Sequence, residues 1–401
     1  MFKSKRIILL YLLLIISLFE NTTLEAAENL TLIQVLNDNI NGVDGLANPR
    51  DIKIKADNSR VFISSGDDNA LAVFNADKHF NLAFSQLFKN TPPTLKGLEG
   101  ASGLTYLPKH RQVTVTGFYD GALTLFNETD KTITYSYTLS DDLSYKNVFA
   151  DNAVLKSPDT LGLLGAWDVI HSANEKQLLA ASYMSNAISI FDVKADHTVI
   201  FKQKITYAKP YADSLGKPVS LALSPSNDAL FVLGYENHQL TIFDRHTDGT
   251  LAVKQVIKHS EDGVTHCLNP QKIVTSPNGQ FLYVACSGSH SIGVLQKAPN
   301  GKYRFIKAIT NAEIGTDSLK GASSLAISNK GDTLYAAGEL GTGLHVFNVQ
   351  EDATLALKES LYNIGEQKLK GISALTLTPD NQHLLVATGK GNSLIVFKRQ
   401  L

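Results

Sequence analysis

Charged side chains stand at the points of this chain where we expect the first strand of each repeated unit to begin. Arg50, Asp168 and Lys272 are three such residues, and His171 follows Asp168 closely. A carboxylate near a cation can act as a general base or orient a water molecule for hydrolysis. The cations can hold a carboxylate or a sugar acid. We therefore take Arg50, Asp168, Lys272 and, more remotely, His171 as candidate catalytic residues.

Three neighbours of these residues complete a candidate ligand-binding set. Asp51, Trp167 and Gln271 adjoin Arg50, Asp168 and Lys272 in the chain, and Trp167 is the only tryptophan. Both charge signs and one large aromatic ring suit a pocket for a small polar or aromatic ligand. The same residues could instead form a self-neutralising ring of ion pairs around a water-filled channel, and the sequence leaves both interpretations open.

Histidines and carboxylates also gather in a second stretch, between residues 236 and 290. His238, His266 and His290 are its weak candidates for metal ligands, because imidazole and carboxylate suit zinc. Their spacing matches no compact metal motif, and they could equally well be solvated histidines in loops. We expect no metal and no organic cofactor, since the motifs for nucleotide loops, HExxH zinc sites and serine elbows are absent from the sequence.

The elements that must position these residues follow from a repeat. One short motif occurs seven times: LAVFN (71–75), LTLFN (123–127), ISIFD (188–192), LTIFD (240–244), IGVLQ (292–296), LHVFN (344–348) and LIVFK (394–398). Most neighbouring copies lie 50 to 52 residues apart, as the distances from Phe347 to Phe397 and from Phe191 to Phe243 show. A period of this size is typical of propellers and other repeat arrays.

Each unit contains short β-rich runs separated by turns rich in Gly, Asn, Asp and Ser, as in antiparallel hairpins. Four strands per unit and seven units predict an all-β fold, a seven-bladed β-propeller. The last unit has only three strands before the chain stops. We therefore expect residues 29–39 to pair with residues 393–398 and close the ring. The turns between second and third strands and the connections between units should share one face, which we call the upper face.

The units resemble those of the lactonase-type and YVTN-type propellers. SPNGQFLYVACSGSHSIGVLQKAPNGKYRFIKAI (276–309) has that family's Pro-x-Gly turn before a Leu-Tyr-Val strand, and DGTL (248–251) is a feature of the lactonase group. The resemblance spans residues 29–401 and implies a propeller, with either lactone-opening, ring-isomerising or purely binding activity. The family's Pro-Arg-His context has its nearest matches at 48–51 and 269–272. Arg50 corresponds to the arginine, whereas Asp51 and Lys272 stand where the histidine would be.

The first 27 residues have the form of a signal peptide. A basic stretch, MFKSKR, precedes the apolar run IILLYLLLIISLF (7–19) and small residues Ala26 and Ala27. A membrane anchor is the alternative, but the run is short for the roughly 20 residues that span a bilayer. We expect removal of residues 1–27, a single propeller domain over residues 28–401, and a monomer that is exported to the periplasm or secreted, with no membrane span.

Two further features stay open. Cys267 and Cys286 lie on either side of the turn at 276–280, and in an oxidising compartment they could form a disulfide or remain two thiols. Residues 140–162 make the spacing from Phe126 to Phe191 65 instead of 52. Such an insertion is either a functional loop on the upper face or a tolerated surface excursion.

Two functions remain possible. The first is a scaffold that binds a small polar ligand or a protein partner through its upper face and channel mouth. The second is an enzyme that hydrolyses or isomerises a lactone of a small sugar acid or carboxylate. The formal net charge of -1 gives no reason to expect nucleic acid as a partner.

Overall fold

The computed structural model describes residues 29–146, 158–206, 211, 213–261, 263–315, 319–365 and 367–400. The expected signal peptide, residues 1–27, and the middle of the insertion at 140–162 lie outside the described residues. No helix among those described is long and apolar enough to cross a membrane.

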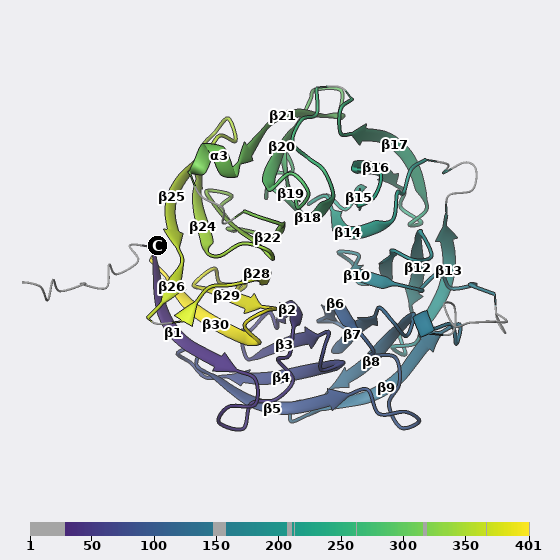
Figure 1. Ribbon diagram of the computed structural model, residues 1–401. Helices are drawn as coiled ribbons and strands as arrows, with labels where there is room; N and C mark the ends of the chain where they lie inside the picture. The colour runs from purple at the N-terminus through teal and green to yellow at the C-terminus, as the bar shows by residue number, and fades with distance from the viewer. Residues whose placement is uncertain are drawn as a thin grey trace, which may run out of the picture.

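Seven four-stranded antiparallel sheets surround a central channel (Figure 1). Blades one to three are β2 (Pro49–Ile54), β3 (Arg60–Ser65), β4 (Ala70–Ala76) and β5 (Leu82–Lys89); β6 (Ala101–Leu107), β7 (Gln112–Gly117), β8 (Ala122–Glu128) and β9 (Ile133–Ser140); and β10 (Ala166–His171), β11 (Gln177–Ser182), β12 (Ala187–Val193) and β13 (Val199–Ile205). The first strand of each sheet lies beside the channel and the last lies at the periphery.

Blades four to six repeat this order. They are β14 (Pro218–Leu223), β15 (Ala229–Gly234), β16 (Gln239–Arg245) and β17 (Leu251–Lys258); β18 (Pro270–Thr275), β19 (Phe281–Cys286), β20 (Ser291–Lys297) and β21 (Tyr303–Thr310); and β22 (Ala322–Ile327), β23 (Thr333–Gly338), β24 (Leu344–Val349) and β25 (Leu355–Leu361). A one-turn helix, α3 (Asn311–Ile314), follows β21, and the small hairpin β26 (Asn363–Ile364) and β27 (Gln367–Lys368) follows β25.

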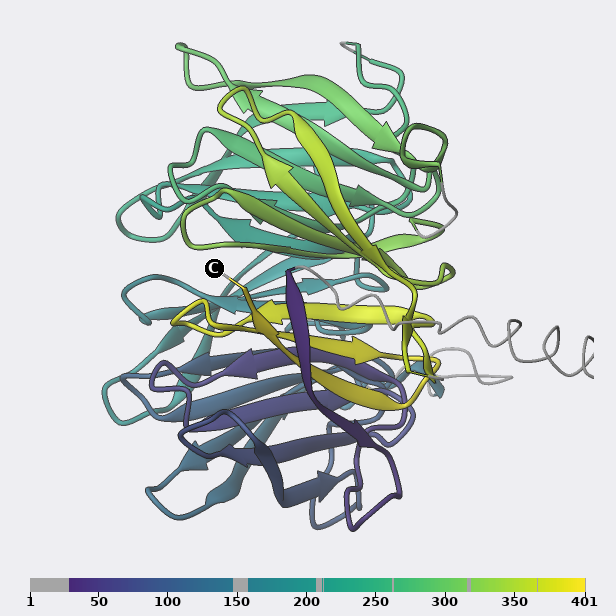
Figure 2. The same ribbon diagram turned by 90° about the vertical axis from the view of Figure 1, so that its left-hand side faces the viewer.

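The seventh blade joins the two ends of the propeller. It contains β28 (Ile372–Leu377), β29 (His383–Thr388), β30 (Ser393–Arg399) and, as its outer strand, β1 (Leu30–Asn37). β1 runs antiparallel to β30, with Leu30 opposite Arg399 and Asn37 opposite Ser393, and Figure 2 shows the two strands side by side. The predicted seven-bladed fold and its closure by the N-terminal strand are both confirmed.

The hydrophobic core lies between the blades. Every residue of β3, β7 and β11 is buried, because a neighbouring blade covers each face of the sheet. The outer strands expose part of one face, as β5 does. The repeated phenylalanines of the motif are almost fully buried, among them Phe74, Phe243 and Phe397. Their burial explains why the motif recurs at so constant a position.

The turn between the second and third strands has the same structural requirement in six of the seven blades. Its fourth residue has a positive φ, at Asn69, Gly121, Asn186, His238, His290 and Asn392, whereas in blade six the positive φ falls one residue later, at Gly343 after Thr342. Where that residue has a side chain, it accepts a hydrogen bond from a backbone N–H just before the next blade's first strand. Asn69 accepts from Gly100 at 2.7 Å, and His290 accepts from Gly321 at 3.1 Å. These contacts hold each blade to its neighbour.

Cys267 and Cys286 are joined by a disulfide, with their Cα atoms 4.9 Å apart. Cys286 ends β19 and lies opposite Pro270, and Cys267 precedes β18. The bridge therefore ties the segment that leads into the fifth blade's inner strand to that blade's second strand.

We expect reduction of this disulfide to destabilise the protein. The bridge joins residues that are 19 apart in the sequence. Closing a loop of that order lowers the conformational entropy of the unfolded chain, which stabilises the folded protein by about 3 kcal/mol. The urea midpoint of the oxidised protein should fall when dithiothreitol is added, whereas a Cys267→Ser/Cys286→Ser variant should already unfold at the lower midpoint and not respond. An unchanged midpoint for the reduced wild-type protein would contradict this expectation.

Candidate active site in the channel mouth

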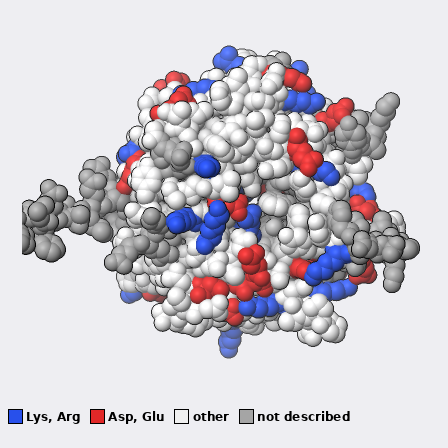
Figure 3. Space-filling view, viewed as in Figure 1, with Lys and Arg blue, Asp and Glu red and all other residues white. Residues whose placement is uncertain are grey.

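A cavity of about 270 Å³ occupies the upper end of the channel. Residues at the starts of all seven inner strands contribute to its lining, including the three predicted pairs. Its walls are formed by Arg50, Asp51, Lys53, Ser102, Gly103, Trp167, Asp168, Val219, Ser220, Gln271, Lys272, Ser323, Ser324, Leu325, Glu339, Ser373, Ala374, Leu375 and Thr376. Figure 3 shows side chains of both charge signs around the hollow at the middle of the ring.

A β-bulge at the start of each inner strand explains why two consecutive residues face the cavity. In a regular strand, neighbouring side chains point to opposite faces. Here the register with the second strand shifts between Pro49 and Asp51, between Ala166 and Asp168 and between Pro270 and Lys272. The other four blades have the same irregularity. Bulges redirect side chains in this way at sheet ends and beside active sites.

Asp51 and Asp168 occupy the same position in blades one and three. The Oδ2 atom of Asp51 accepts the backbone N–H of Leu104 at 3.0 Å, and the Oδ2 atom of Asp168 accepts that of Leu221 at 2.8 Å. Both carboxylates therefore hold the following blade. Both residues are largely buried, with 8% and 7% of their surfaces exposed. Bulk water therefore screens the charge of each carboxylate only weakly.

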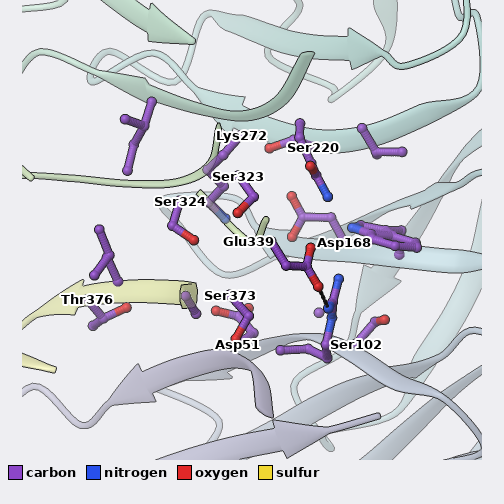
Figure 4. A pocket seen from close by; sticks show the side chains of 18 of the residues that line it. Asp51, Ser102, Asp168, Ser220, Lys272, Ser323, Ser324, Glu339, Ser373 and Thr376 are labelled. Carbon is purple, nitrogen blue, oxygen red and sulfur yellow. Dashed lines mark hydrogen bonds and ion pairs between the residues drawn. The ribbon is translucent and has the colours of Figure 1, made fainter. Parts of the chain in front are cut away.

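The two carboxylates differ in their charged partners. Lys53 donates to both oxygens of Asp51, at 2.8 and 2.7 Å. Burial by itself would raise the pKa of Asp51, but Lys53, Lys272 and the Leu104 N–H together hold it below its usual value. No described residue donates a hydrogen bond to Oδ1 of Asp168. In Figure 4 the Asp168 carboxylate points toward the middle of the cavity.

Lys272 places an ammonium group in the cavity without a direct acceptor. It forms no hydrogen bond or ion pair with any residue in the described part of the chain. Burial alone would lower its pKa, but the negative charges of Asp168 and Asp51 outweigh that effect and raise the pKa above its usual value. The side chain therefore stays protonated at neutral pH, and its donors are available to a ligand.

Arg50 crosses the channel mouth. Its guanidinium is 2.5 Å from Glu339, which follows β23 in the sixth blade, and the dashed line in Figure 4 marks this ion pair. It also lies 5.5 Å from the ring centre of Trp167 in the third blade. Blade seven separates blade six from Arg50, and blade two separates blade three from it. The guanidinium therefore lies over the opening of the cavity.

The structure brings together six of the seven candidate catalytic and ligand-binding residues. Arg50, Asp51, Trp167, Asp168, Gln271 and Lys272 all line the cavity. His171 does not. It is the last residue of β10, beyond the bulged end of that strand, and its Nδ1 atom lies 2.9 Å from the Ser172 carbonyl oxygen.

The structure does not bring His238, His266 and His290 into a group of three potential metal ligands among the described residues. The one group of three potential ligands among the described residues is Asp38, Asp44 and Asp68, and Lys89 already binds two of these carboxylates. His238 and His290 are fourth residues of their turns and accept backbone N–H groups of the next blade. His266 is exposed, in the connection before β18. Asp262, in the same cluster, lies outside the described residues.

Sequence reasoning missed Glu339, Lys53 and Thr376. Thr376 donates to the Ile52 carbonyl oxygen at 3.1 Å and so links blade seven to blade one. The sequence does contain a signal for Lys53. It stands two residues after Asp51 on the same strand, and residues two apart on a strand point to the same face. Glu339 has no equivalent acid in the other turns, so the repeat offered no signal for it.

Known proteins support this description of the chain. Residues 201–400 match the profile of a family described as Lactonase, 7-bladed beta-propeller. The chain belongs to the lactonase-type seven-bladed propellers. Among solved structures, the lactonase-type propeller is similar to the periplasmic gluconolactonase of Pseudomonas aeruginosa, with a TM-score of 0.62 and 12% identity over 81% of this chain and 86% of that one. That likeness shows the shared fold.

Two curated relatives are more limited matches. The lactonase-type propeller is 24% identical over 181 residues to the 6-phosphogluconolactonase of Klebsiella pneumoniae, which is 45% of this chain and 52% of that protein. It is 23% identical over 360 residues to Protein HIR2 of Candida albicans, 86% of this chain and 34% of that protein. The chain thus spans about half, or less, of the length of these curated relatives.

Proposed function

We propose that this protein hydrolyses a lactone of a small sugar acid in the channel mouth. The observation that carries the proposal is the pairing of Asp168 and Lys272 in one cavity, each with a polar group that no described residue engages. The resemblance to gluconolactonase and 6-phosphogluconolactonase supports the choice of a lactone. The serine hydroxyls around the cavity, from Ser102 to Ser373, suit a polyhydroxylated ring.

Asp168 is the proposed general base. Its Oδ1 atom would take a proton from a water molecule while that water oxygen attacks the lactone carbonyl carbon. The carbonyl electron pair then moves onto oxygen and forms an oxyanion. When the ring C–O bond breaks, the protonated Asp168 returns its proton to the leaving ring oxygen. The product is the open-chain hydroxy acid, so no further reactant is needed.

Lys272 is the proposed oxyanion stabiliser. Because no described residue accepts a hydrogen bond from its ammonium, the group can interact with the developing negative charge without first breaking a bond. The low exposure of the site strengthens that attraction. Arg50 would lie above the ring and interact with an oxygen of the ligand. Because Glu339 already pairs with Arg50, a ligand must enter past this ion pair or displace it.

Asp168→Asn should abolish most lactone turnover and leave the fold intact. The asparagine oxygen can still accept the Leu221 N–H, but the amide cannot take a proton from water. Loss of a general base typically lowers the rate by about 10²–10⁴, and Lys272→Met should lower kcat by about 10²–10³. A panel of aldonolactones, assayed by proton release with EDTA present and absent, would measure both effects.

Asp51→Asn is the matched control. Asp51 holds the Leu104 N–H as Asp168 holds that of Leu221, but Lys53 neutralises its charge. This variant should keep turnover within a few fold of wild type. Equal losses in the two aspartate variants would remove Asp168 from its proposed role. Binding without turnover on any lactone would return the protein to the alternative of a ligand-binding scaffold.

A further inference from the structure

Aromatic side chains form a continuous group on one side of the channel mouth. Phe118 and Tyr119 lie in the turn after β7, Trp167 is the second residue of β10, and Tyr145 lies in the connection between blades two and three. The ring centres of Phe118 and Trp167 are 5.4 Å apart, those of Phe118 and Tyr119 are 5.1 Å apart, and those of Tyr119 and Tyr145 are 5.6 Å apart. We call these four residues the aromatic rim.

Two residues of the aromatic rim are exposed, and Phe118 and Trp167 are half-buried. Tyr119 and Tyr145 have 43% and 38% of their surfaces exposed. The rings meet at interplanar angles of 76° to 88°, so each presents a face that the others do not cover. In Figure 3 the surface over β10 is largely uncharged, in contrast to the charged side of the hollow over β22 and β28.

The fold does not require an aromatic residue at the position of Tyr119. Six of the seven turns between second and third strands have a positive φ at their fourth residue, which the backbone demands. Their second residues are Asp67, Tyr119, Met184, Glu236, Gly288, Leu340 and Lys390. All seven turns form, so this position tolerates acid, base, glycine and aromatic side chains alike. In a repeat protein, a feature that the shared structure does not explain in one blade points to a role outside folding.

The aromatic rim is also continuous with the cavity, because Trp167 belongs to both. The cavity holds about 270 Å³, slightly below the ~300–1,000 Å³ of sites that take drug-sized ligands. A single sugar ring fits such a space, and a second ring attached to it must lie outside. The aromatic rim reaches the cavity through Trp167 and offers exposed rings for it at Tyr119 and Tyr145.

We propose that the ligand is a disaccharide-derived aldonic lactone whose non-reducing sugar stacks on the aromatic rim. This inference rests on the proposed function for the reacting ring and adds a second subsite for the other ring. The aliphatic face of a pyranose packs on tyrosine and tryptophan rings, and the tyrosine hydroxyl supplies a polar contact at the edge. The lactone ring would occupy the cavity between Asp168 and Lys272, and Tyr119 would contact the outer sugar.

Trp167 makes a direct binding experiment possible, because it is the only tryptophan of the chain. Its fluorescence should be titrated with gluconate and with cellobionate, the non-reacting acids of the one-ring and two-ring lactones. Cellobionate should bind about tenfold more tightly than gluconate, a typical gain for one added aromatic contact. Tyr119→Ala should remove this difference and leave the affinity for gluconate unchanged.

Tyr362→Ala is the control, since Tyr362 is an aromatic residue of similar exposure, 40%, between blades six and seven. It should leave both affinities unchanged. Equal binding of the two acids by the wild-type protein would overturn the proposal, as would a Tyr119→Ala variant that keeps the preference for cellobionate. Tighter binding of the aryl acid phenylacetate than of cellobionate would show that the rim takes an aryl group, which also overturns the sugar assignment. Because these acids do not react, the result is independent of turnover.

Discussion

A chain that lacks residues 1–37 should fail to form a cooperatively folded propeller. This deletion removes β1 and leaves one edge of β30 unpaired. It also removes Leu30 and Leu36, which are 2% and 9% exposed and pack in the cores on opposite sides of the seventh blade. Burial of each leucine contributes about 1.5–3 kcal/mol, and domains are typically stable by only about 5–15 kcal/mol.

The measurement is thermal unfolding followed by near-ultraviolet circular dichroism. A chain that lacks only residues 1–28 keeps β1 and should melt in one sharp transition. Two point variants provide a finer comparison on the same strand. Leu36→Asp places a charge in the core and should lower the melting temperature strongly, whereas Leu32→Asp, at a position 42% exposed, should change it little. A normal melt for the chain that lacks residues 1–37 would show that closure by β1 is dispensable.

Acidification below pH 6.5 should destabilise the protein through His345. This side chain is fully buried in the sixth blade, its Nδ1 atom lies 2.7 Å from Ser360 Oγ, and its Nε2 atom has no partner among the residues that the structure describes. Burial lowers the pKa of His345 to about 4. Between that value and the unfolded value of about 6.5, the unfolded chain binds one more proton than the folded protein. Stability therefore rises with pH in this window and falls as the pH decreases.

The expected loss is about 3 kcal/mol between pH 7 and pH 4, at 1.36 kcal/mol for each unit of pKa difference. Urea unfolding of the wild type and of His345→Gln at several pH values would measure it. As the pH falls, the free energy of unfolding of the wild type should decrease more than that of His345→Gln. Titration of the carboxylates affects both proteins alike and cancels in the comparison. His246→Gln, at an exposed site, is the control. A constant difference between wild type and His345→Gln would contradict the prediction.

The fold could be read from the sequence because each structural requirement occurs seven times. The motif phenylalanines mark one buried position per blade, and the unpaired third strand at 393–398 indicates where β1 belongs. Trp167, Gln271 and their neighbours were placed correctly for the same reason, since the repeat identifies equivalent positions in every blade. Periodicity therefore located the paired residues at the strand starts, though not the whole lining of the cavity.

The details of the site depend on features without a periodic signal. The β-bulge at each inner strand has no sequence mark, yet it turns both Trp167 and Asp168 toward the cavity. Glu339 is a single acid in one turn, and its ion pair with Arg50 joins residues 289 apart across the channel. His171 was grouped with Asp168 because it is near in the chain, but three residues along an extended strand take it about 10 Å away. The distinction between the two aspartates depends on Lys53, which only coordinates reveal.

The positions of the turn that carries Tyr119 have different roles. In six of the seven copies the fourth position has a positive φ, and its side chain, where it has one, contacts the next blade, whereas the second position varies freely among the seven copies. Mutations at the second position can therefore alter what the mouth binds at little cost to stability. A propeller of this kind offers selection seven such positions around one opening, so new ligand preferences can arise one substitution at a time without rebuilding the scaffold.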